Sequence, residues 1–306
     1  MKKVSIVVPC YNESSSIVIL KNKLDEEIKG YQLEFLFIDD GSTDDTLKMF
    51  NMLSEQDKRF KFISFSRNFG HQNALKAGID NADGDCLITM DADMQHNPAV
   101  IVEMLGKWEE GYDIVYTIVK SQKSLPFFKR TASRIFNRLF SYLSDSSGPA
   151  IGSDFRLIDR KIADILKSDF QEFFLFYRGI IGWIGYNQYA LEYIPENRIA
   201  GESKYSNKKM FSFALNGITS FSTKPLRIIT ILGLIISSFA FLYGIYALYI
   251  FFFTDKAITG WSSVILSILL IGGLQLVFLG IIGEYIGKLF FEIKRRPNYL
   301  IKTKNF

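Results

Sequence analysis

Two pairs of aspartates follow apolar runs in the first third of the chain. Asp39 and Asp40 end one run, and Asp91 and Asp93 come directly after the run Leu87–Met90. Carboxylates are costly to bury unless they bind a cation or hydrogen-bond donors. A nucleoside diphosphate held by Mg²⁺ or Mn²⁺ would supply both, so these aspartates are candidates for binding an activated phosphate compound.

Short apolar runs alternate with helical patterns over the first 120 or so residues. We expect strands at Val4–Val8, Phe35–Asp39, Phe62–Phe65, Leu87–Met90 and Ile114–Tyr116. Helices are expected at Ser15–Lys29, from about Thr43, at Gln72–Asn81 and at Pro98–Trp108. This alternation predicts an α/β, Rossmann-like fold with a mainly parallel, doubly wound sheet. Ligands of such sheets bind at the carboxyl ends of the strands, where both aspartate pairs are expected.

Two long stretches near the carboxyl terminus carry no charged residue, residues 228–253 and 257–283. Each exceeds the roughly 20 apolar residues that cross a bilayer core. We therefore predict a transmembrane hairpin with spans at about 228–253 and 261–284; two buried core helices are the alternative. Lysines and arginines lie on both sides of the hairpin, whereas its loop carries only Lys256 beside Asp255. The positive-inside rule then predicts an integral protein of the cytoplasmic membrane with both termini in the cytoplasm.

Other features argue against secretion and against nucleic acid as a partner. The run Val4–Val8 is too short for a signal peptide and is ended by Pro9. Cys10 and Cys86 lie at or within predicted strands, which favours reduced thiols over a disulfide. The formal net charge is only +4, and we expect no nucleic-acid partner.

A basic segment follows the alternating region. Residues 120–138 contain six basic residues and no acid, with Arg130, Arg134 and Arg138 spaced four apart. This pattern predicts an amphipathic helix that lies on an anionic membrane or binds phosphate; a solvated surface helix is the alternative. Residues 173–186 and 210–221 are rich in aromatic side chains and fit either the membrane interface or ordinary packing helices.

Six sequence blocks in a fixed order point to a known family. Together they span nearly all of the chain before the hairpin, and they are PCYNE (9–13), DDGSTDDT (39–46), SRNFGHQNAL (66–75), DADMQ (91–95), SDFRLIDR (153–160) and GESKYS (201–206). The chain resembles family 2 glycosyltransferases of the GT-A fold. Within that family it is most similar to polyprenyl-phosphate glycosyltransferases such as bactoprenol glucosyltransferases and dolichol-phosphate mannose synthases.

The resemblance implies a set of donor-site residues. Contacts to the nucleotide sugar would come from Pro9, Tyr11, Glu13, Asp40, Asn68, His71 and Asp91. Asp93 and Gln95 would hold Mg²⁺ or Mn²⁺, with Asp91 nearby on the ribose or the metal. A polar loop that only caps the following helix is the alternative for this last group.

The resemblance also implies how the acceptor is held. Asp154 occupies the family's proposed catalytic position, as a base or a positioning group, unless it simply pairs with Arg156. Phosphate on the acceptor would be bound by basic and hydroxyl side chains, namely Lys129, Arg130, Arg134, Arg198, Ser203 and Lys204.

These expectations combine into one function and one domain division. We expect a homo-oligomeric membrane enzyme that transfers a sugar to polyprenyl phosphate with inversion and with the help of a metal ion. UDP-glucose is the first expectation for the donor. Another donor sugar, or a non-catalytic scaffold or flippase, is the alternative. The expected divisions are a catalytic GT-A domain at 1–165, acceptor-binding interfacial helices at 166–224, the hairpin at 225–290 and a cytoplasmic tail at 291–306.

Overall fold

A computed structural model describes residues 1–119, 153–193, 222–253 and 260–306 of the protein. The described part contains an eight-stranded sheet in the order β7-β5-β6-β4-β1-β2-β3-β8. Its strands are β1 (Lys3–Cys10), β2 (Gln32–Asp39), β3 (Phe60–Phe65), β4 (Cys86–Thr89), β5 (Ile114–Val119), β6 (Arg156–Asp159), β7 (Gln188–Tyr193) and β8 (Ile301–Lys304). Strands β4, β1, β2 and β3 pair in parallel, while β6 runs antiparallel to both β4 and β5. The predicted α/β fold with a mainly parallel sheet is therefore confirmed.

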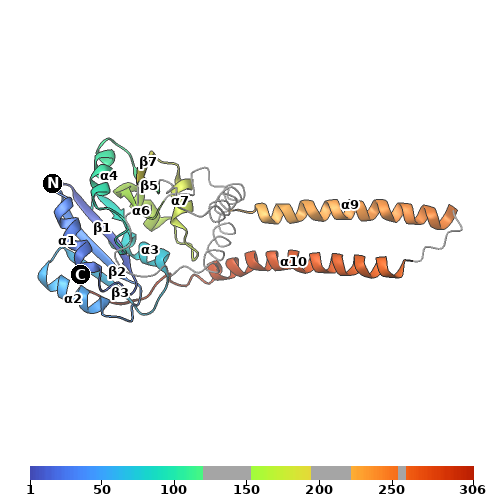
Figure 1. The fold of residues 1–306 in the computed structure, drawn as a ribbon, viewed down its shortest axis with the longest axis horizontal. Helices are drawn as coiled ribbons and strands as arrows, with labels where there is room; N and C mark the ends of the chain where they lie inside the picture. Colours follow the sequence, from blue (N-terminus) through green and yellow to red (C-terminus); the bar gives the residue numbers. More distant parts are fainter. Residues whose placement is uncertain (120–152, 194–221, 254–259) are drawn as a thin grey trace.

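Helices cover both faces of this sheet (Figure 1). They are α1 (Ile17–Glu27), α2 (Thr46–Gln56), α3 (His71–Asn81), α4 (Ala99–Glu109), α6 (Arg160–Ser168) and α7 (Tyr177–Ile184). Successive side chains of a strand point to opposite faces. In β1, Ile6 and Val8 accordingly join the core under α1, α2 and α4, whereas Val7 packs with α3, α6 and α7. Strands covered on both faces explain why the apolar runs of the sequence are nearly continuous.

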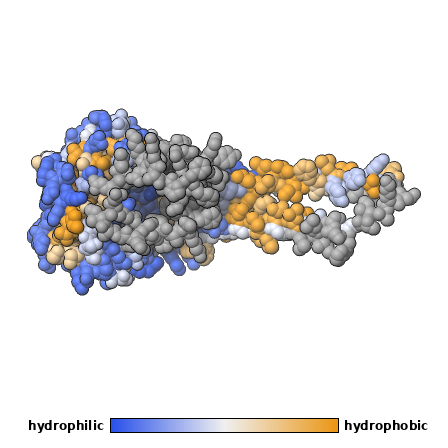
Figure 2. All heavy atoms as spheres, in the orientation of Figure 1, coloured by the Kyte–Doolittle hydropathy of each residue, from blue (hydrophilic) through white to orange (hydrophobic). Residues whose placement is uncertain are grey.

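Two long helices project from this domain as an antiparallel pair (Figure 1). These are α9 (Lys224–Phe253) and α10 (Trp261–Ile293), and both are long and apolar enough to cross a membrane. Their large apolar side chains are exposed, for example Phe239 at 71% and Leu276 at 72%. Figure 2 shows the resulting hydrophobic surface beside a largely hydrophilic domain. Such exposure does not fit the alternative of buried core helices, and it favours the predicted hairpin.

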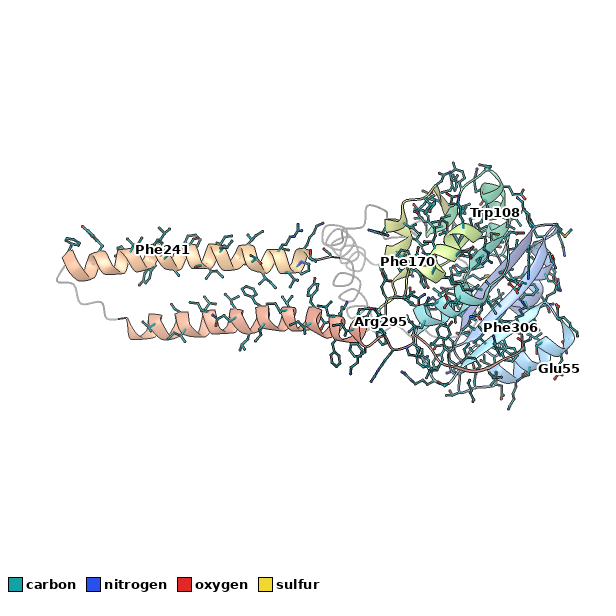
Figure 3. The ribbon with its side chains drawn as sticks, turned by 180° about the vertical axis from the view of Figure 1, so that it is seen from behind. Glu55, Trp108, Phe170, Phe241, Arg295 and Phe306 are labelled. Carbon is teal, nitrogen blue, oxygen red and sulfur yellow. The ribbon has the colours of Figure 1, made fainter. Side chains whose placement is uncertain are left out.

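The segment after α10 returns to the sheet, which the sequence did not predict. From Arg295 the chain runs back across the domain to Phe306 (Figure 3), and strand β8 adds antiparallel to the edge strand β3. Tyr299 stacks on Phe65 with ring centroids 5.0 Å apart, and its hydroxyl donates a 3.0 Å hydrogen bond to Asp80. Residues 301–304, expected as part of a cytoplasmic tail, thus cover an otherwise open sheet edge.

Candidate active site

Three loops meet at the carboxyl ends of β1, β2 and β3. The backbone N–H of Asn12 donates to the Ser42 hydroxyl at 2.9 Å, and the Asn12 side-chain oxygen accepts from the Thr43 N–H at 2.8 Å. Gly41 adopts φ +68° and packs directly on the backbone of Arg67 and Asn68. The blocks PCYNE, DDGSTDDT and SRNFG therefore form one connected surface, as expected where strand ends converge.

Substitution of Gly41 by alanine is expected to disrupt this surface. An added Cβ would lie only 2.7 Å from the Asn68 nitrogen, and the positive φ is unfavourable for any other residue. We expect a loss of about 2 kcal/mol in the free energy of unfolding and a higher KM for the sugar donor. Gly106→Ala is the matched control, because a Cβ there meets nothing within 4 Å. Equal melting temperatures for the two variants would contradict the predicted clash.

The two aspartates at the carboxyl end of β2 organise these loops. Asp40 is only 4% exposed, and its carboxylate accepts hydrogen bonds from the backbone N–H groups of Phe69 (2.6 Å) and Gly70 (3.0 Å). Burial raises the pKa of Asp40 to about 6, although these two bonds act to lower it. Asp39 accepts from the Ser42 N–H at 2.8 Å in the same way. Asp40 thus holds the loop before α3, and its contact with a nucleobase stays a prediction.

Other predicted donor residues lie around the same loops. Tyr11 is 38% exposed, and Asn68 is exposed in the loop between β3 and α3. Pro9 is buried within β1, and the backbone N–H of Glu13 donates to the Thr46 hydroxyl at 3.0 Å. The structure therefore brings the predicted donor residues to the carboxyl ends of neighbouring strands. Their individual contacts with a nucleotide sugar stay predictions.

The loop after β4 carries oxygen donors suited to a hard divalent cation. Asp91, Asp93 and Gln95 are each half-buried, and Met94 between them has φ 61°, which turns the chain sharply. Burial opposes ionisation of Asp91, but the His96 hydrogen bond and the nearby His71 lower its pKa below the usual value. Mg²⁺ typically takes one or two carboxylates and completes its shell with phosphate oxygens and water. The donor set of this loop fits Mg²⁺ or Mn²⁺ in that manner.

Asp154 lies at the centre of an ion cluster. Its carboxylate accepts from Arg156 Nη2 at 2.9 Å and from Arg178 Nη2 at 2.9 Å, and His71 Nε2 lies 3.7 Å away. Burial alone would raise the pKa of Asp154, but His71 and the two arginines hold it far below its usual range. A carboxylate stabilised this strongly as an anion is a poor proton acceptor near neutral pH. Of the two predicted roles, this arrangement favours positioning over general base catalysis.

His71 connects the cluster to the loop that contains Asp91 and Asp93. Its Nε2 lies 3.6 Å from Asp91 and 3.7 Å from Asp154, so the two carboxylates flank one imidazole. Burial lowers the pKa of His71, but hydrogen bonding to Asp154 and the charges of both aspartates raise it overall. His96 also contacts the Asp91 carboxylate, through Nε2 at 3.3 Å. The other ring nitrogen of His96, Nδ1, lies 2.9 Å from the Tyr193 hydroxyl. A continuous polar network therefore runs through the site.

Sequence reasoning missed part of this network. Arg178, His96 and Tyr193 were not among the predicted site residues. Arg178 and Tyr193 meet their partners from other elements of the fold, and His96, which contacts Asp91 within one loop, also pairs with the distant Tyr193. Only the presence of Arg178 within an aromatic-rich segment hinted at a special role. In the structure that segment includes α7, which buries Ile180 in the core and leaves Trp183 66% exposed.

The predicted acceptor residues lie outside the described part of the chain. This applies to Lys129, Arg130, Arg134, Arg198, Ser203 and Lys204, and to the aromatic-rich residues 210–221. Their binding of an acceptor phosphate stays a prediction.

Comparison with known proteins identifies two family segments. Residues 5–166 match Glycosyl transferase family 2, and residues 224–289 match the GtrB C-terminal hairpin. The first segment contains the loop Asp91–Gln95 and Asp154, and the second contains most of α9 and α10.

Relatives match over nearly the whole chain. The uncharacterized glycosyltransferase YkcC of Bacillus subtilis is 44% identical, with 97% of this chain and 93% of the relative covered. A prophage bactoprenol glucosyl transferase homolog of Escherichia coli is 39% identical, with 98% of both chains covered. A bactoprenol glucosyl transferase derived from the SfII prophage in Shigella flexneri is 38% identical, with 99% of this chain and 98% of the relative covered.

A solved structure agrees with the fold. Glucosyl-3-phosphoglycerate synthase from Mycobacterium tuberculosis, crystallised with Mn²⁺, UDP and phosphoglyceric acid, has a TM-score of 0.50 at 16% identity. The match covers 71% of this chain and 76% of that one. The family segments and the relatives agree with the acidic loop found at the carboxyl end of β4. This chain is a glycosyltransferase that belongs to family 2 and carries a GtrB-type C-terminal hairpin.

Proposed function

We propose that the protein transfers a glucosyl group from UDP-glucose to polyprenyl phosphate at the cytoplasmic face of the membrane. The observation that carries this proposal is the site itself, in which a loop suited to a divalent cation and an arginine-paired carboxylate flank His71. The relatives named bactoprenol glucosyl transferases, which match along the full chain, support the acceptor and the sugar. The apolar pair α9 and α10 supports a lipid acceptor.

The proposed step is a single displacement at the anomeric carbon. An oxygen of the lipid phosphate forms a bond to that carbon while the bond to the donor's diphosphate breaks, and the nucleoside diphosphate leaves with the electron pair. The configuration inverts because the two oxygens lie on opposite sides of the carbon. A phosphate monoester is already ionised near neutral pH, since its second pKa is about 6. The reaction therefore needs no strong base, which agrees with the low pKa of Asp154.

The residues around the reacting atoms have separate tasks. Asp93, Gln95 and Asp91 would hold Mg²⁺ or Mn²⁺, which when bound stabilises the charge on the leaving diphosphate. The loops that contain Tyr11 and Asp40 would position the nucleotide. Lys129, Arg130, Arg134, Arg198, Ser203 and Lys204 would gather the acceptor at the membrane surface, as predicted from the sequence.

The proposed orientation follows from charge and the hairpin. Basic residues on both sides of α9 and α10 would keep the catalytic domain and both termini in the cytoplasm. Residues 1–165 would then form the catalytic domain, residues 166–224 the acceptor region and residues 225–290 the membrane hairpin. Assembly as a homo-oligomer belongs to the same proposal.

Release of nucleoside diphosphate by the purified full-length protein tests the proposal. With short-chain polyprenyl phosphate and Mg²⁺ or Mn²⁺, we expect release from UDP-glucose that stops when either the lipid phosphate or the metal is omitted. If another nucleotide sugar releases its nucleoside diphosphate faster, that compound would be the donor, and the proposed lipid acceptor would be unchanged. The absence of lipid-dependent release with every donor would favour a scaffold and contradict the proposal.

A further inference from the structure

A buried histidine directly follows the loop Asp91–Gln95. Buried and half-buried residues alternate along this stretch, so that the two carboxylates and the amide of the loop are half-buried, whereas Met94 and His96 are buried. His96 is 6% exposed and therefore takes a core position beside the predicted oxygen ligands. Burial of a polar ring costs free energy unless its hydrogen bonds are made. The partners of this imidazole therefore indicate why a histidine occupies the position.

Both ring nitrogens of His96 have partners. Nε2 lies 3.3 Å from Oδ2 of Asp91, and Nδ1 lies 2.9 Å from the hydroxyl of Tyr193, the last residue of β7. An ionised carboxylate only accepts hydrogen bonds, so the Nε2 proton belongs to the contact with Asp91. In the neutral ring, Nδ1 then accepts from the tyrosine hydroxyl. Tyr193 thus selects the tautomer of His96 that donates to Asp91.

Aromatic rings from distant parts of the chain hold the imidazole in place. The ring of His96 lies against that of Phe155, with centroids 4.6 Å apart and an interplanar angle of 33°, and its centroid is 5.8 Å from that of Tyr193. Phe155 is fully buried, and Tyr193 is 6% exposed. Because this packing restricts rotation of the ring, Nε2 is directed at Asp91 before any ligand binds.

Asp91 is the member of this group that faces the site. Its side chain is 39% exposed, whereas that of His96 is 6% exposed. Oδ2 contacts His96, and Oδ1 lies 3.6 Å from Nε2 of His71, so an imidazole flanks each oxygen of the carboxylate. A carboxylate offers about four lone-pair sites, which leaves Asp91 able to accept a ligand as well. The carboxylate is therefore both oriented and able to bind.

The core does not need a polar pair at these two positions. Apolar side chains of the same shape would fill the space without an internal hydrogen bond, and such double exchanges are often nearly neutral for stability. A buried partner that fixes the direction of a ligand carboxylate is instead the common support of a metal site. Asp91 belongs to the loop whose oxygen donors suit Mg²⁺ or Mn²⁺, which gives His96 and Tyr193 something to support.

We propose that His96 and Tyr193 position the Asp91 carboxylate for the metal-bound nucleoside diphosphate of the donor. This inference rests on the donor of the proposed function and names two positioning residues for its site. Neither side chain touches the donor, and both act through Asp91. Without them the carboxylate would be free to take other orientations, and the donor would bind more weakly because binding would have to restrict that freedom.

The test measures binding of Mn²⁺ together with UDP by calorimetry, without sugar or lipid, to full-length wild-type, His96→Leu, His96→Gln and Tyr193→Phe proteins. Leucine removes the hydrogen bond to Asp91, and loss of such a supporting partner predicts a rise of about tenfold or more in Kd. Phenylalanine removes one hydroxyl and keeps the ring, which predicts a rise of about threefold or more. Glutamine carries an N–H that can replace Nε2, so His96→Gln should recover part of the affinity that His96→Leu loses.

Kinetics supply a second readout. In the transfer assay, Tyr193→Phe should raise the KM for UDP-glucose, while the KM for short-chain polyprenyl phosphate should change by less than about twofold. A merely structural role would not separate the two substrates in this way.

Tyr299→Phe is the matched control. The hydroxyl of Tyr299 also donates a hydrogen bond within the protein, to Asp80 at 3.0 Å, but this contact joins the segment after α10 to the end of α3. The control removes the same atom from the same residue type at a distance from the loop Asp91–Gln95. It should keep the wild-type Kd and both wild-type KM values.

The outcomes separate this inference from the proposed function. Unchanged Kd values in His96→Leu and Tyr193→Phe would overturn the inference, while wild-type transfer to the lipid would uphold the proposed function. An equal loss of affinity in Tyr299→Phe would also overturn it, because the effect would then be general. Weaker binding in the site variants alone, with no transfer by wild type, would support the inference and contradict the proposed acceptor.

Two further results are decisive. If wild type binds no Mn²⁺ with UDP, the proposed donor and this inference both fail. Should His96→Leu not fold, Tyr193→Phe decides, because it differs from wild type by a single oxygen atom.

Discussion

Replacement of Asp93 by alanine is expected to lower kcat by about a thousandfold or more while the protein stays folded and membrane-bound. A metal that stabilises the leaving diphosphate contributes several kcal/mol to the transition state, and about 4 kcal/mol corresponds to a thousandfold in rate. Asp93 is half-buried in a loop, outside the hydrophobic core, so its truncation should cost little stability.

The measurement is lipid-dependent release of nucleoside diphosphate at saturating donor and at increasing metal concentration. Asp164→Ala is a suitable control, because Asp164 is an exposed aspartate on α6 whose side chain is 60% accessible. The control should keep full activity and a normal metal response. Near-normal turnover of Asp93→Ala, at the metal concentration that saturates wild type, would refute the assignment of the metal to this loop.

Replacement of Asp154 by asparagine is expected to lower both activity and stability. Asparagine keeps the size of the side chain but removes the charge that pairs with Arg156 and Arg178. Breaking a buried ion pair from one side leaves an uncompensated charge and costs about 3–5 kcal/mol. We also expect a loss of about a hundredfold or more in kcat/KM, because the ion cluster beside His71 would lose its fixed geometry.

Thermal unfolding should therefore distinguish the two aspartate variants. Asp93→Ala should melt near the wild-type temperature, whereas Asp154→Asn should melt several degrees lower. A folded Asp154→Asn protein with wild-type stability would contradict the buried charge cluster. If wild-type kcat/KM fell as a group became protonated near neutral pH, and Asp154→Asn lost that pH dependence, Asp154 would have to be a titrating base, contrary to its lowered pKa.

Much of the fold could be predicted because its central strands are buried on both faces. Strands β1 to β5 and helices α1 to α4 lie where the alternation of apolar runs and helical patterns placed them, within a few residues at each end. The aspartate pairs were recognisable because they directly follow such strands. The hairpin was recognisable because uncharged stretches of that length are rare in soluble cores.

Short strands defined by their partners could not be predicted. Strand β8 has the sequence IKTK and is exposed along its length, so nothing in it distinguishes a strand from a tail. It forms because β3 offers an unpaired edge, a property of the assembled sheet. Strand β6 runs antiparallel between β4 and β5, an order that sequence periodicity does not encode.

The charge cluster escaped prediction for a similar reason. Asp154 was assigned from its sequence block, but its partners His71 and Arg178 come from α3 and α7, which the fold brings together. Pairing with Arg156 was considered as an alternative to catalysis, and the structure confirms that contact. The two interpretations are compatible, because a carboxylate that pairs with Arg156 also contacts His71 and can position it.

Analysis of the lipid product by mass spectrometry tests the central claim most directly. After incubation of the purified full-length protein with UDP-glucose, a divalent cation and short-chain polyprenyl phosphate, we expect the lipid to gain a single hexosyl group on its phosphate. The same mixture with Asp93→Ala should yield unmodified lipid. If folded wild-type protein leaves the lipid unmodified with every nucleotide sugar and both metals, transfer to a polyprenyl phosphate is contradicted.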